Sequence, residues 1–271
     1  AWILSSYTFF FGDDFVSVKL LPFIFYFFTS YVIYLLALEI FKKKEIAIIS
    51  VITFYLMPAV SVSSFLISTD VVLVFFWSLL LLFLLKVRRQ KKIINFLMLG
   101  IFLGLALLTK YAAAYFILSL MILFFFDKKT REIFTKNIIG FFIFVFSALV
   151  VVMPNIIWNI NNDWITLVHT SENAGLSRMG FSLLQGLEFL LIQGLMVGPV
   201  IFLVFLFNIK NLSFNFETKF LLCFSFPIFF IVFVESVLVR ANANWAAVAL
   251  VPLFLLIVNY AYVYSKKILI L

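Results

Sequence analysis

Lys110 stands inside a long apolar stretch, in "GLALLTKYAAAYFI" (residues 104–117), and residues 93–126 carry no other charge. An ammonium at the centre of a bilayer costs about 2.5–3.5 kcal/mol on insertion scales. Basic clusters flank the stretch at both ends, and both belong in the cytoplasm under the positive-inside rule, so the number of crossings between them is even. One helix over residues 93–126 would be about 51 Å long, against a hydrocarbon core of about 30 Å. We therefore predict two short helices that turn at 109–111 and place Lys110 at the external membrane face.

Few other basic residues share this face. Of the 20 Lys and Arg, all but four lie in short loops that we assign to the cytoplasm, and the four are Lys19, Lys110, Arg178 and Arg240. Carboxylates also gather there, at Asp13, Asp14, Asp70, Asp163, Glu172, Glu188 and Glu235. Any one of these groups could be a simple interfacial anchor. Glu188 and Glu235 lie a turn or two inside their spans, where a carboxylate usually faces the bundle interior and a partner; Arg240 is a possible partner for Glu235.

The external segments carry the residue types that bind a phosphorylated sugar. Residues 154–180, "PNIIWNINNDWITLVHTSENAGLSRMG", interleave Asn, Asp, Glu, His and Arg with two Trp. Cations supply charge and donors for phosphate, while amides and Trp rings supply hydrogen bonds and flat surfaces for sugars. Trp158, Trp164 and Trp245 have two alternative roles: they bind a sugar, or they belong to the ordinary aromatic belt at the membrane interface.

The composition excludes a soluble domain. The chain is 66% hydrophobic and 12% charged, with a mean hydropathy of +1.23, whereas soluble domains average about 45–50% apolar and about 25% charged. We predict an all-α integral membrane protein, a polytopic helix bundle with about nine transmembrane helices in a single domain over residues 1–271. The expected spans are 19–40, 46–67, 71–86, two within 93–126, 138–153 (ending at Pro154), 182–207, 220–238 and 246–264.

Charge and the rare reactive residues exclude further classes. The net charge of +8 lies in short loops between spans, which indicates membrane anchoring and not nucleic-acid binding. Cys223 is the single cysteine and His169 the single histidine, so we expect no internal disulfide, no protein-ligated transition metal and no cofactor. The chain opens "AWILSSYTFF", without Met and without a basic start, which we interpret as the middle of a larger protein and not as a signal peptide.

Several segments together resemble a known family. They are "FGDDFVSVKLLPFIFYFFTSYVIYLLALEIF", "STDVVLVFFWSLLLLFLL", "GLALLTKYAA", "PNIIWNINNDWITLVHTSENAG", "LEFLLIQGLMVGPVIF" and "ANWAAVALVPL", in order over nearly the whole chain. They are similar to bacterial membrane glycosyltransferases related to protein O-mannosyltransferases and the lipid A aminoarabinose transferase. "GLALLTKY" and "ANWAA" are the most telling pieces.

The resemblance implies an inverting glycosyltransferase of the GT-C type. Such an enzyme passes a sugar from a polyprenyl-phosphate carrier to a lipid, glycan or protein acceptor at the external (periplasmic) face of the bacterial inner membrane. The family's catalytic acid sits in the first external loop, and the resemblance implies a position for it upstream of residue 1. We therefore expect the chain to be N-terminally truncated relative to the family, with its catalytic residue unknown. Asp13 and Asp14 match the "FGD" that follows this loop. We therefore expect the chain alone not to transfer sugar; if it did, Asp70 would be the first acid to consider as base.

The same resemblance assigns roles to particular residues. Lys110 and Arg240 are the expected phosphate contacts, with Arg178 behind them, and Lys19 matches a position that is usually Arg. Asp70 matches a family acid and is a candidate for binding sugar or acceptor and for the catalytic role. Asn244 and Trp245, in "ANANW", complete the predicted substrate-binding set.

Two other functions remain open at this level. A transporter or lipid flippase would place ionisable residues near mid-membrane and show interrupted helices in paired halves; here the charges lie at external span ends, and we detect no internal repeat. An inactive remnant or a structural membrane subunit is the second alternative, and it rests on the expected truncation. Membrane lipids are expected partners in every case.

Overall fold

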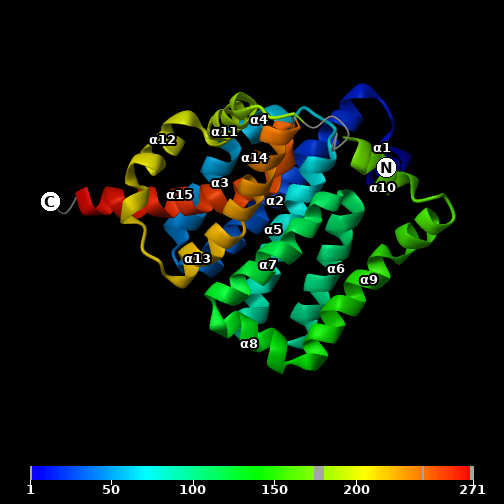
Figure 1. Ribbon diagram of the computed structural model, residues 1–271, viewed down its shortest axis with the longest axis horizontal. Coiled ribbons are helices and arrows are strands. Elements are labelled where there is room, and N and C mark those ends of the chain that lie inside the picture. Colours follow the sequence, from blue (N-terminus) through cyan, green and yellow to red (C-terminus); the bar gives the residue numbers. More distant parts are fainter. Residues whose placement is uncertain (1, 174–179, 240, 269–271) are drawn as a thin grey trace.

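The computed structural model describes residues 2–173, 180–239 and 241–268, and these residues form helices joined by short turns and loops, with no strand. The long helices run in alternating directions across one bundle (Figure 1). The helices are α1 (Trp2–Phe11), α2 (Phe15–Phe41), α3 (Lys44–Leu56), α4 (Pro58–Ser63), α5 (Thr69–Gln90), α6 (Ile93–Thr109), η1 (Tyr111–Ala114), α7 (Tyr115–Phe126), α8 (Lys128–Lys136), α9 (Ile138–Ile160), α10 (Ile165–Asn173), α11 (Leu183–Val197), α12 (Pro199–Asn208), η3 (Ile209–Asn211), α13 (Phe216–Cys223), α14 (Phe226–Leu238), η4 (Ala243–Ala246) and α15 (Ala247–Ile268).

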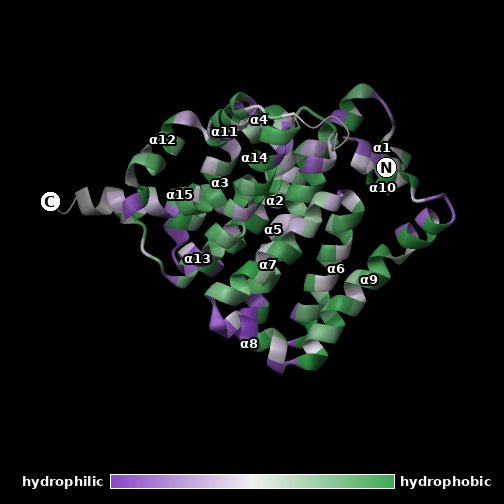
Figure 2. Cartoon of the chain, viewed as in Figure 1, coloured by the Kyte–Doolittle hydropathy of each residue, from purple (hydrophilic) through white to green (hydrophobic). Residues whose placement is uncertain are grey.

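The all-α membrane character is confirmed, but nine crossings are not. Five described helices are long and apolar enough to cross a bilayer, or up to seven if each bent pair counts as one span. Hydrophobic residues make up most of the length of the helices, as the colouring by residue hydropathy shows (Figure 2). The predicted pair of helices within 93–126 is present: α6 ends at Thr109, Lys110 is its C-cap, and α7 follows after η1.

Three expected spans differ from the observed helices. The span 46–67 breaks into α3 and α4 because Met57 is extended and Pro58 begins a new helix. The span 182–207 bends by 114° between α11 and α12, where Gly198 has φ 121° and Pro199 starts the next helix; glycine alone adopts such a φ without strain. The helix expected over 138–153 does not end at Pro154 but continues to Ile160. Pro154 lacks one backbone N–H donor, but in an apolar setting the chain still gains by keeping the remaining backbone hydrogen bonds of the helix.

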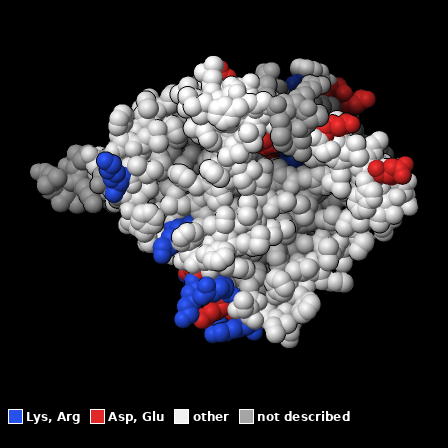
Figure 3. Space-filling model, viewed as in Figure 1, with Lys and Arg blue, Asp and Glu red and all other residues white. Residues whose placement is uncertain are grey.

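The basic loops meet at one end of the bundle. Arg88 makes a bidentate ion pair with Asp127, at 2.9 and 3.2 Å, which joins the end of α5 to the start of α8. Arg89 contacts Glu39 at 3.1 Å and thereby joins the ends of α5 and α2. Figure 3 shows this group of Lys and Arg at the bottom of the molecule, with acidic side chains mainly near the top. Burial alone would raise the pKa of Asp127, but hydrogen bonds from Arg88 and Thr130 outweigh it and hold the pKa below its usual value.

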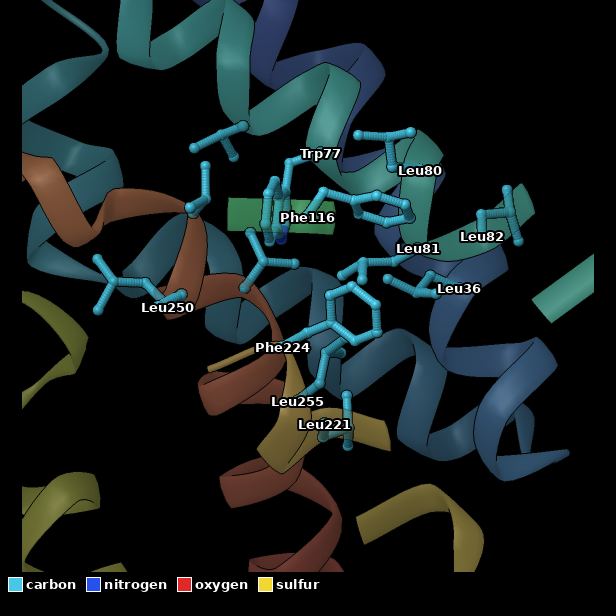
Figure 4. Packing of buried hydrophobic residues seen from close by; sticks show 14 of the residues in the cluster. Leu36, Trp77, Leu80, Leu81, Leu82, Phe116, Leu221, Phe224, Leu250 and Leu255 are labelled. Atoms are coloured by element: carbon cyan, nitrogen blue, oxygen red, sulfur yellow. The ribbon is translucent and has the colours of Figure 1, made fainter. Parts of the chain in front are cut away.

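Close helix packing and an aromatic core hold the bundle together. Gly100 and Gly104 of α6 face α9, where an added Cβ would lie 2.2 Å from the carbonyl oxygen of Phe144 and 2.9 Å from that of Ala148. A pair of glycines four residues apart lets two membrane helices approach closely. Elsewhere, Trp77 of α5 contacts the rings of Phe116 and Phe224, with centroids 5.8 and 6.3 Å away (Figure 4). These contacts join α5 to α7 and to the end of α13.

Candidate functional site

A buried carboxylate with three partners lies at the end of the bundle opposite the basic loops. Asp70 accepts through Oδ1 from the Lys110 ammonium at 2.7 Å. Its Oδ2 accepts from the Asn244 amide at 2.6 Å and from the Ser68 hydroxyl at 3.1 Å. We call Ser68, Asp70, Lys110 and Asn244 the Asp70 cluster. A carboxylate offers about four acceptor positions, so most of the capacity of Asp70 is used within the protein.

Helix ends position each member of the cluster. Ser68 is the N-cap of α5, where its hydroxyl accepts from the backbone N–H of Asp70. Asp70 lies in the first turn of that helix, where the helix dipole favours a negative charge. Lys110 is the extended residue between α6 and η1, and Asn244 lies in η4, just before α15. Three chain segments that are distant in sequence thus meet at their ends.

The Lys110–Asp70 pair is partly shielded from solvent. Their side chains are 27% and 13% exposed, respectively. A buried pair needs good geometry and further hydrogen bonds to offset the desolvation of its charges, and Asn244 and Ser68 supply these. An ammonium has three N–H donors; Asp70 occupies one, which leaves donors of Lys110 for a ligand.

Lys110 lines a cavity of about 880 Å³. Drug-sized ligands and cofactors usually occupy cavities of about 300–1,000 Å³. The walls come from the starts of α5 and α7, the end of α6, η1, α9, α10, α14 and η4. The polar and aromatic lining residues are Thr69, Thr109, Lys110, Tyr111, Tyr115, Asn155, Thr166, His169, Thr170, Glu235 and Trp245.

A hydroxyl and amide network closes one side of this cavity. The Tyr111 hydroxyl is 2.7 Å from Thr166 Oγ1 and donates to Asn155 Oδ1 at 3.3 Å. Thr166 also donates to Asn159 Oδ1 at 2.5 Å. The network joins η1 to α9 and α10. The connection between those two helices contains Asp163 and Trp164, with φ 52° and 55°, a conformation that is rare for a bulky residue and that brings α10 back over the cavity.

A second cavity, of about 200 Å³, lies on the other side of the Asp70 cluster. Ser68, Asp70 and Asn244 line it, together with Tyr26 and Ser63, and the rest of its wall is mainly apolar. Tyr26 and Ser63 are hydrogen-bonded through their hydroxyl groups at 2.5 Å. Asp70 therefore contacts Lys110 at the larger cavity and itself lines the smaller one.

The structure brings four of the predicted site residues together: Asp70, Lys110, Asn244 and Trp245. Lys19 does not line this cavity; its ammonium donates to the carbonyl of Phe65 at 2.6 Å, so its charge serves a loop contact. Arg178 and Arg240 lie outside the described residues. No group of three potential metal ligands occurs in the part of the chain that is described.

Glu188 and Glu235, the two carboxylates that we expected to face the bundle interior, differ in their exposure. Glu235 lines the larger cavity and is half-buried, whereas the side chain of Glu188 is exposed. Glu188 shows that a position one or two turns inside a span does not decide which way a side chain points.

Sequence reasoning did not single out Tyr111, Asn155, Thr166 or His169 as site residues. Tyr111 directly follows Lys110, and the other three lie in the polar segment that we expected at the external face. The signal for them was therefore the segment as a whole. Trp158 and Trp164 belong to the same segment but are exposed and do not line the cavity.

Fold and site together define an all-α membrane protein with an ion-paired polar cluster and a ligand-sized cavity at one end. The family model for dolichyl-phosphate-mannose-protein mannosyltransferases matches residues 1–158. The chain belongs to this family, which confirms the resemblance found in the sequence.

Two individual proteins are similar to this chain. The lipid A galacturonosyltransferase RgtD of Rhizobium johnstonii is 32% identical over 206 residues, which cover 73% of this chain and 42% of that protein. The crystal structure of ArnT from Cupriavidus metallidurans, bound to undecaprenyl phosphate, matches with a TM-score of 0.69 and 15% identity, over 95% of this chain and 48% of that one. This chain thus shares the ArnT fold and spans about half the length of both relatives.

Proposed function

We propose that this protein takes part in the transfer of a sugar from a polyprenyl-phosphate carrier to a lipid, glycan or protein acceptor. The observation that carries the proposal is the Lys110 ammonium, held at 2.7 Å by buried Asp70 and lining a cavity of about 880 Å³. Family membership supports the reaction class. RgtD is named for lipid A galacturonosyl transfer, and ArnT was crystallised with undecaprenyl phosphate, which supports a polyprenyl-phosphate donor.

In this proposal Lys110 binds the carrier phosphate. The charge on the departing phosphate grows as the bond to the sugar breaks, and a fixed cation stabilises it. Asp70 orients the ammonium and holds the Asn244 amide, while the Ser68 hydroxyl donates to the Asp70 carboxylate, so that the main role of Asp70 is positioning. One acceptor position of the carboxylate is still unused, which leaves Asp70 a candidate base for the acceptor hydroxyl. Trp245 offers a flat face for a sugar ring.

The rival functions receive less support. A transporter would be expected to bind its substrate near the bilayer midplane, between paired broken helices. Here the cavity is formed by helix ends, on the side away from the basic loops. No observation favours a purely structural subunit over an enzyme.

The test is carrier binding in a defined membrane. We expect the purified protein in nanodiscs to bind undecaprenyl phosphate, which equilibrium binding measures. Product chromatography with a radiolabelled sugar on the carrier measures transfer to envelope lipids and glycans separately, and transfer by this chain alone would make Asp70 the first acid to consider as base. A protein that bound no undecaprenyl phosphate would contradict the proposal.

The proposed orientation places the cavity at the external face of the inner membrane, in a chain with nine crossings. Reporter fusions after Phe41, Arg89, Lys129 and Lys210 should report the cytoplasm, since these positions lie in or beside the basic loops. Fusions after Ser68, Asn162 and Ala243 should report the external side. An external signal at Arg89 or Lys129 would contradict this topology, because both belong to the end of the bundle that carries the Arg88–Asp127 pair.

A further inference from the structure

The α8 helix carries a surplus of positive charge at the basic end of the bundle (Figure 3). Its basic residues are Lys128, Lys129, Arg131 and Lys136, and its carboxylate is Glu132. Glu132 lies 3.4 Å from Lys136 and 4.0 Å from Lys128, so two cations share a single negative charge. Among the residues that the structure describes, no carboxylate forms an ion pair with Lys129 or Arg131. The positive charge of α8 is therefore only partly neutralised within the protein.

The packing of α8 fixes its direction across the end of the bundle. The chain bends by 112° between α7 and α8. Thr130, Ile133 and Phe134 form the buried face of α8. The Phe134 ring contacts the rings of Phe96 and Phe144, with centroids 5.6 and 6.0 Å away. One face of α8 is therefore held against the bundle, and the rest of its surface is left for other contacts.

Lys129 and Arg131 flank this buried face. Successive residues of an α-helix are about 100° apart around its axis, so the two neighbours of buried Thr130 lie along opposite edges of the helix. Both residues are exposed. Arg131 donates to the carbonyl of Phe124 at 3.4 Å, which uses one of its five N–H donors. A cation with unused donors is therefore available on each side of α8.

Exposed apolar side chains adjoin both ends of α8. Phe125 and Phe126, at the end of α7, are 82% and 60% exposed. Ile138 and Ile139, at the start of α9, are 61% and 67% exposed. Exposed apolar surface of this kind marks contact with a membrane or a partner, and in a membrane protein lipid hydrocarbon covers it. The cations of α8 thus lie at the level where the hydrocarbon ends and the lipid headgroups begin.

We infer that α8 binds anionic phospholipids of the surrounding membrane. The headgroup phosphates contact Lys129 and Arg131, and the acyl chains lie against the exposed apolar residues of α7 and α9. Each Lys or Arg near an anionic lipid surface contributes about fivefold in affinity, and a guanidinium also forms bidentate hydrogen bonds with phosphate. Inorganic phosphate and nucleic acid lack the acyl chains that cover the apolar residues. Binding of these lipids at α8 is independent of the reaction that the larger cavity supports.

Photolabelling with a lipid probe tests this site in the full chain. The probe is phosphatidylglycerol with a photoreactive group on one acyl chain, in nanodiscs of phosphatidylcholine, and labelled residues are mapped by peptide mass spectrometry. We expect labelling within residues 125–142 that unlabelled phosphatidylglycerol displaces and that further phosphatidylcholine does not. Lys129→Gln combined with Arg131→Gln should weaken the binding of phosphatidylglycerol at this segment about 25-fold, which is about fivefold for each cation. Labelling of α2 at Phe27, which is 65% exposed, should stay unchanged and shows that the variant is folded.

Lys42→Gln combined with Lys44→Gln is the matched control. It removes the same charge from two exposed residues between α2 and α3, outside α8, and should leave the labelling of residues 125–142 as in the wild type. Equal displacement by phosphatidylcholine and phosphatidylglycerol, or unchanged binding in the α8 variant, would overturn the inference. Displacement by inorganic phosphate as effective as that by phosphatidylglycerol would also overturn it, because the site would then bind phosphate without a lipid.

Discussion

Lys110→Ala should weaken binding of undecaprenyl phosphate by about 1.5–3 kcal/mol, which is about 10- to 150-fold in the dissociation constant. This is the usual contribution of a hydrogen bond to a charged group. The substitution reduces the affinity for the carrier phosphate because the Lys110 ammonium lies at a cavity wall and has N–H donors that Asp70 does not occupy. Titration of the purified protein in detergent with labelled undecaprenyl phosphate measures it.

Two further substitutions separate the charge of Lys110 from its structural contact. Lys110→Gln retains a donor for Asp70 but lacks the positive charge, so it should bind the carrier almost as weakly as Lys110→Ala. Lys110→Arg should be tolerated only in part, since a planar guanidinium directs its donors differently from a compact ammonium. Lys136→Ala is the control, because Lys136 is exposed and belongs to α8 at the opposite end of the bundle. Equal affinities in the wild type, Lys110→Ala and Lys110→Gln would exclude Lys110 from the phosphate site.

Asp70→Ala should destabilise the fold as well as the site. The substitution leaves the Lys110 ammonium and the Asn244 amide without their partner at the junction of α5, α6 and η4. Breaking a buried ion pair typically costs about 3–5 kcal/mol, and we expect the lower end of that range because the Lys110 side chain is 27% exposed. The free energy of unfolding, measured by denaturing-detergent titration, checks this value.

A double-mutant cycle distinguishes the ion pair from simple loss of packing. Asp70→Asn alone leaves an unmatched cation, whereas Asp70→Asn combined with Lys110→Gln removes both charges. The double variant should be more stable than the sum of the two single effects predicts, since neither charge is left alone. It should still bind undecaprenyl phosphate weakly. If the two stability changes simply added, the 2.7 Å contact between Lys110 and Asp70 would contribute no interaction energy to the free energy of unfolding.

Local patterns were sufficient for the two helices within residues 93–126 and for the turn at Lys110. Basic clusters at both ends of residues 93–126 require an even number of crossings, and the length of the stretch excludes one straight helix. The observed end of α6 at Thr109 follows from these two constraints. The polar segment after residue 154 likewise indicated where site residues would lie, although not which ones.

Breaks and side-chain directions could not be predicted in this way. Pro58 and Pro154 are both prolines in apolar stretches, yet one starts a new helix and the other lies within α9. The difference depends on whether neighbouring groups let the helix continue, which a local pattern does not contain. Glu188 and Glu235 occupy similar positions in their spans, but only Glu235 lines the cavity.

The sequence by itself determined that this is a helical membrane protein, where its charged ends lie, and that Lys110, Asp70, Asn244 and Trp245 belong to the same face. Only the tertiary structure decided that they share one site. Lys110 is 40 residues from Asp70, and Asn244 is 174 residues from it. Their contacts depend on how α5, α6 and α15 are held by the close approach of α6 to α9 and by the rings around Trp77. Such packing depends on the shapes of many side chains at once, so no local pattern carries it.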